Sequence, residues 1–417
     1  MNKMATLYKN ARLIDPSNET DIKGDLLVEN GVIADVGENL TAHGGVEVID
    51  CKGRILSPGI IDMRSHSVDS VAAAAGGITT VILQPNQTTL IDSDAVVERI
   101  RRRSEDGNSV RVYPMGAATQ GMAGEQVAEI GQMQESGAVA FTDCNKAVSN
   151  PLVMRRLLEY SGYFGALIVQ YAQDDSLAAG GFAHEGELAT RLGLAGIPAA
   201  AEVIQIERDA RLSELTGSPV HFALVSSREG VEAVRRAKAQ GIKITCATAP
   251  HYLMLNDNAL EGYRTFAKVL PPLRGEEDRL ALIAGLADGT IDVMVSDHNP
   301  LSADVKRLPL GQAAAGVVGA ETLLALTLSV VHSGKVDLIT ALKALISTPA
   351  QLLKLPYGTL EKGAPADLMI FDAEKPWRIL ADNFKSVAKN TPFDTVPVQG
   401  QVWRTIVDGK TLFSQEA

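Results

Sequence analysis

The chain has little cysteine. Only Cys51, Cys144 and Cys246 occur among its 417 residues, and no two of them form a C-x-x-C pair. This spacing indicates neither a disulfide framework nor a thiolate zinc site, because both need paired or clustered cysteines. Scarce, unpaired cysteine is typical of a reducing compartment, so we expect a cytoplasmic protein.

The sequence also lacks long apolar runs and an excess of positive charge. No stretch approaches 18 uninterrupted apolar residues, and the first ten residues lack the apolar core of a signal peptide. The formal net charge is -11, whereas proteins that bind nucleic acid usually carry a basic face. We therefore expect no membrane span, no targeting segment and no nucleic acid partner. A small molecule or another protein fits this charge better.

The hydrophobic pattern changes along the chain. Both ends show short alternating runs broken by turn residues, such as Leu26-Leu27-Val28 before Glu29-Asn30-Gly31. The middle alternates apolar strand-like runs with amphipathic helices, the pattern of a parallel sheet covered by helices. We predict an α/β protein in which residues 55–356 form a TIM (β/α)8 barrel. Residues 1–54 and 357–417 should pair into one small β-sandwich domain.

The barrel prediction depends on eight candidate strands, near residues 59–65, 79–84, 110–116, 138–142, 166–171, 219–225, 242–248 and 291–296. In such barrels the functional residues lie at the carboxyl ends of the strands. Several of these ends are polar here: Arg64-Ser65-His66, Gln84-Pro85-Asn86, Thr142-Asp143, Gln170-Tyr171, Ala249-Pro250-His251 and Ser296-Asp297-His298.

These strand ends resemble those of dihydroorotase, a cyclic-amide hydrolase of pyrimidine synthesis in the amidohydrolase superfamily. The resemblance covers essentially the whole chain. It is carried by residues 57–66, Gly76-Gly77-Ile78-Thr79-Thr80-Val81, residues 192–198, Pro271-Pro272-Leu273-Arg274, Val295-Ser296-Asp297-His298-Asn299-Pro300 and Asn390-Thr391-Pro392-Phe393. Asp143 stands where hydantoinases and allantoinases tend to carry a carboxylated lysine, which favours the dihydroorotase branch.

The sequence departs from this family at the metal positions. The resemblance places these positions at Arg64, His66, Asp143, Tyr171, Leu224 and Asp297, and the arginine, tyrosine and leucine replace family histidines. A guanidinium has no lone pair to give to a metal, and leucine has no donor atom. We therefore expect no metal cofactor. If a metal binds after all, the resemblance implies zinc on His66, Asp143 and Asp297.

The substrate side of the family pattern is also incomplete. The loop that follows the family's His-x-His pair is missing, and Leu270 and Leu301 replace a family asparagine and histidine. Asn86 remains a candidate substrate contact. Asp297 would be the general acid and base of a working enzyme and is vestigial otherwise.

We hypothesise that the Arg64 guanidinium lies roughly where a metal would sit. Its planar fork suits a carboxylate, so it should pair with Asp143 or Asp297. Tyr171 and Leu224 should fill the space that the missing histidines leave, since packed interiors tolerate voids poorly.

Three further side chains at the strand ends have simpler interpretations. We expect His251 and His298 to hydrogen-bond neighbouring loops. We interpret Cys144 as an inert buried thiol, because no activating histidine is evident from the sequence.

Two functions follow from the resemblance. In the first, the chain is a catalytically inactive dihydroorotase-like subunit. It would act as a structural partner of the aspartate transcarbamoylase catalytic subunit within an oligomer. In the second, it is an active dihydroorotase or a related cyclic amidohydrolase, which cleaves a cyclic amide C–N bond with an altered, zinc-containing site.

Overall fold

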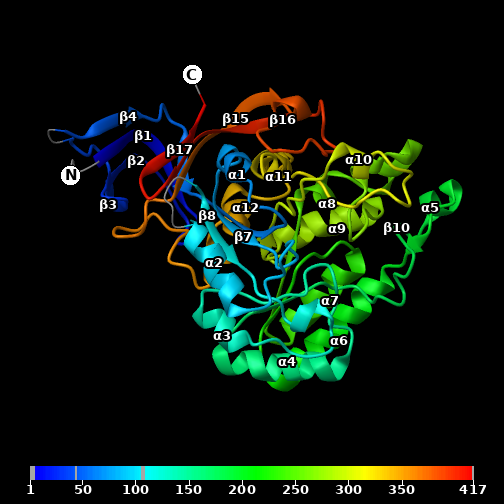
Figure 1. Cartoon of the computed structure of the whole chain (residues 1–417). Helices are drawn as coiled ribbons and strands as arrows, with labels where there is room; N and C mark the ends of the chain where they lie inside the picture. The colour runs from blue at the N-terminus through cyan, green and yellow to red at the C-terminus, as the bar shows by residue number, and fades with distance from the viewer. Residues whose placement is uncertain (1–4, 43–44, 105–108, 416–417) are drawn as a thin grey trace.

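The structure, a computed structural model, describes residues 5–42, 45–104 and 109–415. Figure 1 shows a barrel wrapped by helices, with a β-sheet beside it that contains both the first and the last strands of the chain. Within the described ranges, no helix is both long and apolar enough to cross a membrane.

The barrel wall consists of two parallel sheets. The first contains β6 (Ile60–Ser65), β7 (Ile78–Leu83) and β8 (Arg111–Pro114), and the second contains β9 (Ile168–Gln170), β12 (Val220–Phe222), β13 (Ile244–Thr248) and β14 (Val293–Met294). Phe141 bridges the two sheets through Gly116 and Ile168, and Ser65 pairs with His298 across the other gap. These contacts close the ring and confirm the predicted barrel.

The fourth strand differs from the prediction. Residues 138–142 do not form a regular strand, although Phe141 makes both isolated bridges. Their backbone still exchanges hydrogen bonds with Pro114, Gly116 and Leu167. The position in the wall is therefore filled by a short segment without regular strand structure, and the Asp143 side chain after it accepts hydrogen bonds from the amides of residues 118 and 119.

Helices cover the outside of the barrel. They are α2 (Asp94–Ser104), α3 (Ile130–Glu135), α4 (Pro151–Phe164), α6 (Ala200–Thr216), α7 (Arg228–Ala239), α9 (Glu276–Ala287), α11 (Leu323–His332) and α12 (Leu338–Leu345). Helix α4 shows how the sequence sets their bounds. The Asn150 side chain accepts hydrogen bonds from Leu152 and Val153, Pro151 opens the helix, and Gly165 ends it at a φ of 61°.

The small domain joins the two ends of the chain in one hydrogen-bonded sheet. Its strand order is β17-β16-β15-β5-β1-β2-β3, with β4 beside β1. The strands are β1 (Ala5–Asp15), β2 (Thr20–Glu29), β3 (Val32–Gly37), β4 (Glu47–Asp50), β5 (Ile55–Pro58), β15 (Leu368–Arg378), β16 (Pro397–Val407) and β17 (Lys410–Ser414). The sheet has its own core, which includes Leu13, Leu26, Leu368 and Ile406.

Candidate functional site

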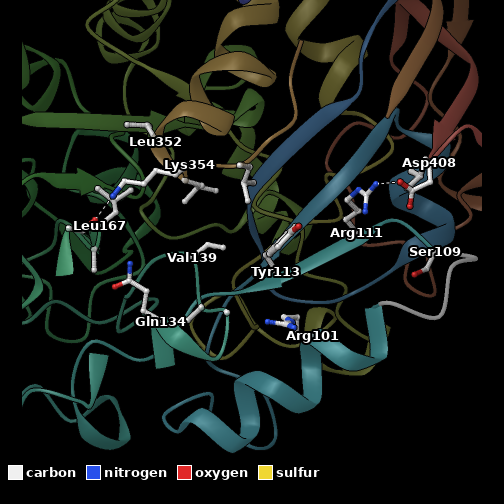
Figure 2. Close-up of a pocket in the computed structure, with 17 residues that line it drawn as sticks. Arg101, Ser109, Arg111, Tyr113, Gln134, Val139, Leu167, Leu352, Lys354 and Asp408 are labelled. Atoms are coloured by element: carbon white, nitrogen blue, oxygen red, sulfur yellow. Dashed lines mark hydrogen bonds and ion pairs between the residues drawn. The ribbon is translucent and has the colours of Figure 1, made fainter. Parts of the chain in front are cut away.

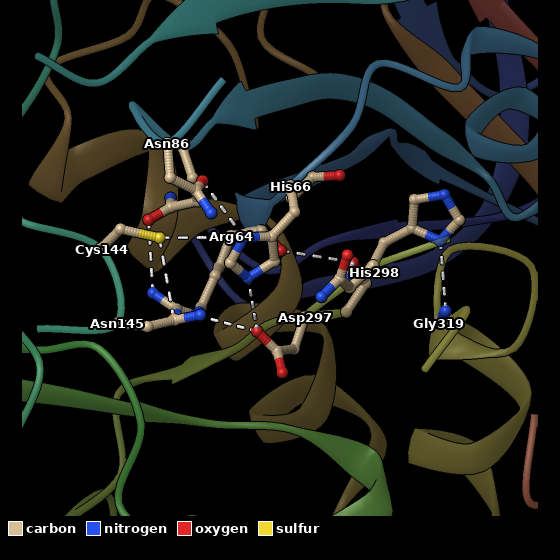
Figure 3. A network of polar contacts seen from close by, with 12 residues as sticks. Arg64, His66, Asn86, Cys144, Asn145, Asp297, His298 and Gly319 are labelled. Carbon is tan, nitrogen blue, oxygen red and sulfur yellow. Dashed lines mark hydrogen bonds and ion pairs between the residues drawn. The ribbon is translucent and has the colours of Figure 1, made fainter. Parts of the chain in front are cut away.

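Arg64 lies at the centre of the barrel mouth. It belongs to β6 and is only 2% exposed. Its Nε donates to Asp297 Oδ1 at 2.8 Å, its Nη1 donates to Gln84 Oε1 at 3.3 Å, and its Nη2 donates to Asn145 Oδ1. Figure 3 shows the Arg64 side chain between Asn145 and Asp297. The pairing expected of Arg64 is thus present with Asp297 and not with Asp143.

Asp297 also contacts His66, which extends the network. Nε2 of His66 lies 3.3 Å from Asp297 Oδ1, and Nδ1 lies 3.3 Å from Asn86 Oδ1. Burial alone would raise the pKa of Asp297, but Arg64 and His66 lower it to about 2. Burial alone would lower the pKa of His66, but Asp297 and Cys144 raise it to about 9. The network therefore favours an ionised carboxylate next to two cations.

The backbone at Asp297 is unusual as well. Its φ is +48°, a left-handed conformation that residues other than glycine rarely adopt. The peptide groups around it are fixed: His66 N donates to His298 O at 2.9 Å, and His298 N donates to Ser296 Oγ at 3.0 Å. The fold thus holds Asp297 in a strained conformation that aims its carboxylate at Arg64.

Asp143 does not join this group. Its Oδ1 accepts hydrogen bonds from the backbone amides of Ala118 and Thr119 at 3.1 and 2.9 Å, and its Oδ2 accepts from the Thr119 hydroxyl. Burial raises the pKa of Asp143, against these hydrogen bonds. The carboxylate is used to fasten neighbouring strand ends together.

Tyr171 and Leu224 occupy the other two family histidine positions. They are 1% and 0% exposed, as expected of residues that fill the interior. Burial raises the pKa of the Tyr171 hydroxyl well above its ordinary value, so this oxygen stays protonated and is a poor metal ligand.

These residues do not fit a catalytic zinc. Such a site normally uses three protein ligands and keeps one position open. Among the residues that the structure describes, no three His, Cys, Asp or Glu side chains gather closely enough to hold a metal ion. His66 and Asp297 meet, but Arg64 takes the space beside them and Asp143 is turned away.

The network includes groups that the sequence did not assign to it. Cys144 Sγ lies 3.8 Å from His66 Nδ1, although no histidine partner was expected for it. Gln84 and Asn145 accept hydrogen bonds from Arg64. Gln84 could have been found because it ends the second strand. Asn145 lies three residues beyond the predicted end of the fourth strand, a position that we did not consider.

A buried carboxylate below Arg64 was also missed. Asp62 accepts hydrogen bonds from Ser296 N at 2.9 Å, from the Ser296 hydroxyl and from the Arg64 amide at 3.3 Å. Burial raises its pKa to about 6, even though the Ser296 hydrogen bonds oppose this shift. Asp62 thus ties β6 to the residue before Asp297.

The two expected structural histidines are both buried. His298 Nδ1 accepts from the backbone amides of Gly319 and Ala320 at 3.2 and 3.4 Å, which is the loop contact that was expected. Nε2 of His251 and Nε2 of His298 have no hydrogen-bond partner among the described residues. Burial lowers the pKa of each to about 4, so both are neutral at pH 7.

A separate cavity of about 640 Å³ lies at the opposite end of the barrel, where the strands begin. Figure 2 shows Arg111, Tyr113 and Lys354 in its wall. The protein itself already engages two of these groups. Arg111 pairs with Asp367 and Asp408, and Lys354 Nζ donates to Gly165 O at 2.8 Å. We assign no site here.

Comparison with known proteins places this arrangement in a family. Residues 177–412 match the family described as Amidohydrolase family, and residues 53–230 match the one described as Dihydro-orotase-like. The structure is similar to L-hydantoinase (dihydropyrimidinase) from Arthrobacter aurescens, with a TM-score of 0.87 and 26% identity over 99% of this chain and 96% of that one. The fold is therefore that of an amidohydrolase.

Relatives found by sequence show which branch of the amidohydrolases this chain belongs to. The chain is 41% identical to a dihydroorotase of Wolbachia sp. subsp. Drosophila simulans over 98% of this chain and 96% of the relative. It is also 41% identical to a dihydroorotase of Citrifermentans bemidjiense over 98% of this chain and 100% of the relative. The chain belongs to the dihydroorotase-like amidohydrolase family.

Proposed function

We propose that this chain serves pyrimidine biosynthesis as a dihydroorotase-family protein that does not itself hydrolyse a ring. Its role would be structural, as a partner of the aspartate transcarbamoylase catalytic subunit in a larger assembly. The observation that carries the first part is the buried Arg64–Asp297 pair, with a nitrogen-to-oxygen distance of 2.8 Å, in place of a metal site.

The chemistry of Asp297 supports this proposal. A general base must accept a proton near neutral pH, but the adjacent Arg64 and His66 lower the pKa of Asp297 to about 2. Within the described part of the chain, no three metal-ligating side chains gather to prepare a nucleophilic water. The family resemblance is our support for the structural role: the barrel and the small domain are retained although the site has changed, and fold and chemistry are separable.

A second candidate is an active dihydroorotase or related cyclic amidohydrolase. The names of the two relatives, both 41% identical over 98% of the chain, favour this candidate over an inactive protein. Asp297 would then be the acid and base, Asn86 a substrate contact, and zinc the cofactor on His66, Asp143 and Asp297. Such a site requires the Arg64–Asp297 pair to open and Asp143 to leave Thr119.

Zinc content and turnover distinguish the two candidates. The purified chain is analysed for bound metal by mass spectrometry and assayed for dihydroorotate hydrolysis, with Asp297→Asn as the matched control. The first candidate predicts no stoichiometric zinc and equal, blank-level rates for both proteins. About one zinc per chain, with turnover that Asp297→Asn abolishes, would establish the second candidate.

The partner needs its own experiment. We expect the chain, co-expressed with an aspartate transcarbamoylase catalytic subunit, to elute with it as one particle whose mass is measured by light scattering. Separate elution of the two proteins at micromolar concentration would refute the structural partnership, whatever the zinc analysis shows.

A further inference from the structure

The segment 301–319, which we name the strap, runs from the turn after β14 to the start of α11. It contains α10 (Ala303–Lys306). Its later part lies against the turn that carries Asp297: Val317 pairs with His298, and Asn299 N donates to Val317 O at 2.8 Å. Gly319 approaches so closely that an added Cβ would lie 2.1 Å from Ser296 O.

A buried lysine holds the strap in place. Lys306 has no exposed surface, and its Nζ donates to Lys268 O at 3.3 Å, Ala314 O at 2.9 Å and Gly316 O at 3.1 Å. An ammonium group has three donors, and all three are used on backbone carbonyls. Among the described residues, no carboxylate lies within ion-pair distance of this group, so its charge is balanced by peptide dipoles alone.

A second lysine ties the strap to the loop after β13. Lys268 is 5% exposed, and its Nζ donates to Leu310 O at 2.7 Å and to Gly311 O at 3.3 Å. The same Nζ lies 4.7 Å from the centre of the Phe182 ring. In return, Gly316 N donates to Lys268 O at 3.0 Å. Lys306 of the strap thus donates to the backbone of the loop that carries Lys268, and Lys268 donates to the backbone of the strap.

Asn390 fastens the strap from the side of the small domain. Its Nδ2 donates to Asn299 O at 3.0 Å and to Gly316 O at 3.1 Å, and its Oδ1 accepts from Leu301 N at 3.0 Å. The strap is therefore held at its beginning, its middle and its end by buried polar side chains.

We propose that residues 301–319 form a locked support for the turn that carries Asp297, with Lys306 as the main lock. An ammonium group removed from water is costly unless it is fully hydrogen-bonded, and Lys306 finds its three acceptors only while the strap is in place. The strap therefore has one discrete docked state and opposes partial release of this turn.

Hydrogen exchange tests the lock in the unmodified protein. The amides of Asn299 and Gly316, which bond Val317 O and Lys268 O, should exchange as slowly as those of the barrel helix α6. Exchange of these two amides at the rate of an unstructured chain would overturn the proposal without any variant.

Trypsin tests the role of Lys306. Arg307 is an exposed trypsin site within the strap. The hydrogen bonds of its neighbour Lys306 hold the surrounding backbone in place. We expect Lys306→Met to raise the rate of cleavage after Arg307 at least about tenfold, since it removes three hydrogen bonds from a charged donor. The matched control is Lys375→Met, an exposed lysine outside the strap, which should leave that rate unchanged.

A rate for Lys306→Met equal to that of Lys375→Met would refute the lock. If Lys306→Met does not fold by circular dichroism, Lys268→Met takes its place with the same expectation, because it removes two of the ties. Zinc content and turnover do not bear on these results, so the strap and the proposed function can fail separately.

Discussion

The barrel mouth and the strap bury positive charge in opposite ways. In the mouth, the guanidinium of Arg64 faces the carboxylate of Asp297 at 2.8 Å. In the strap, the ammonium of Lys306 faces three backbone carbonyls. The partner of Arg64 is thus a side chain that a single substitution removes. The partners of Lys306 are carbonyl groups that every residue type supplies, so only a change at Lys306 itself or in the path of the loop removes these hydrogen bonds.

The largest effect should come from breaking the charge pair in the mouth. Arg64→Met leaves Asp297 buried beside His66 alone, and removing one partner of a buried pair typically costs about 3–5 kcal/mol. We expect a loss of this size in the free energy of unfolding, measured by urea denaturation. The control Arg102→Met disrupts an exposed pair with Glu98 and should change little.

A double variant sharpens this prediction. Asp297→Asn removes the carboxylate charge, so Arg64→Met should cost less in that background than in the original chain. Equal costs in the two backgrounds would mean that the pair contributes through packing and not through charge.

A substitution in the strap should lower the free energy of unfolding by less than Arg64→Met does. Lys306→Met leaves Lys268 O, Ala314 O and Gly316 O without this donor, and we expect a loss of about 1–3 kcal/mol in the free energy of unfolding. Lys375→Met is again the matched control. A loss as large as that of Arg64→Met would contradict the contrast between side-chain and backbone compensation.

Acid should lower the free energy of unfolding, because His221 in the barrel wall and His298 beside the strap are both buried in the neutral form. Burial lowers the pKa of His221 in β12 to about 3 and that of His298 to about 4, whereas the unfolded chain titrates near 6.5. The unfolded state therefore binds more protons below pH 6.5. Stability should fall as the pH is lowered from 6.5 toward 4, by up to about 1.4 kcal/mol per pH unit for each histidine.

Denaturation at several pH values measures this slope. His221→Asn should flatten it, because Asn has no proton to take up, while His332→Gln, at a more accessible histidine near Glu374, should not. An unchanged slope in His221→Asn would show that other groups cause the acid sensitivity.

The smallest effect concerns the metal. Arg64→His restores one family ligand, but Tyr171 and Leu224 still occupy two other positions and Asp143 is bound to Thr119. Added zinc should therefore shift the Tm of this variant by less than about 1 °C, since only a ligand that binds the folded state stabilises it. A rise of several degrees, reversed by a chelator, would show that Arg64 alone keeps zinc out.

The architecture could be predicted from the sequence because apolar residues recur with clear strand or helix periodicity along most of the chain. The alternation of strands and helices gave the barrel, and the turn-rich ends gave the small domain. Residues 125–136 show helical periodicity, but α3 begins only at Ile130, because Val127 pairs with Thr119 in an isolated bridge. Such a local pairing has no signature in helical periodicity.

The site was predicted in part. The sequence identified Arg64 as a replacement for a metal ligand but left Asp143 and Asp297 as equal partners. Only the structure shows that the amides of residues 118 and 119 already occupy Asp143. The contact of Cys144 with His66 and the burial of Lys306 against Lys268 were missed, because both bring together loops that are distant in the sequence.

The sheet that unites the two ends of the chain has a consequence for synthesis. Strand β5 lies between β1 and β15, so one of its edges stays open until residues 368–378 leave the ribosome. An unpaired strand edge can pair with another chain. The nascent protein should therefore be most prone to aggregate late in translation, when the barrel sequence is complete but the closing strands have not yet emerged.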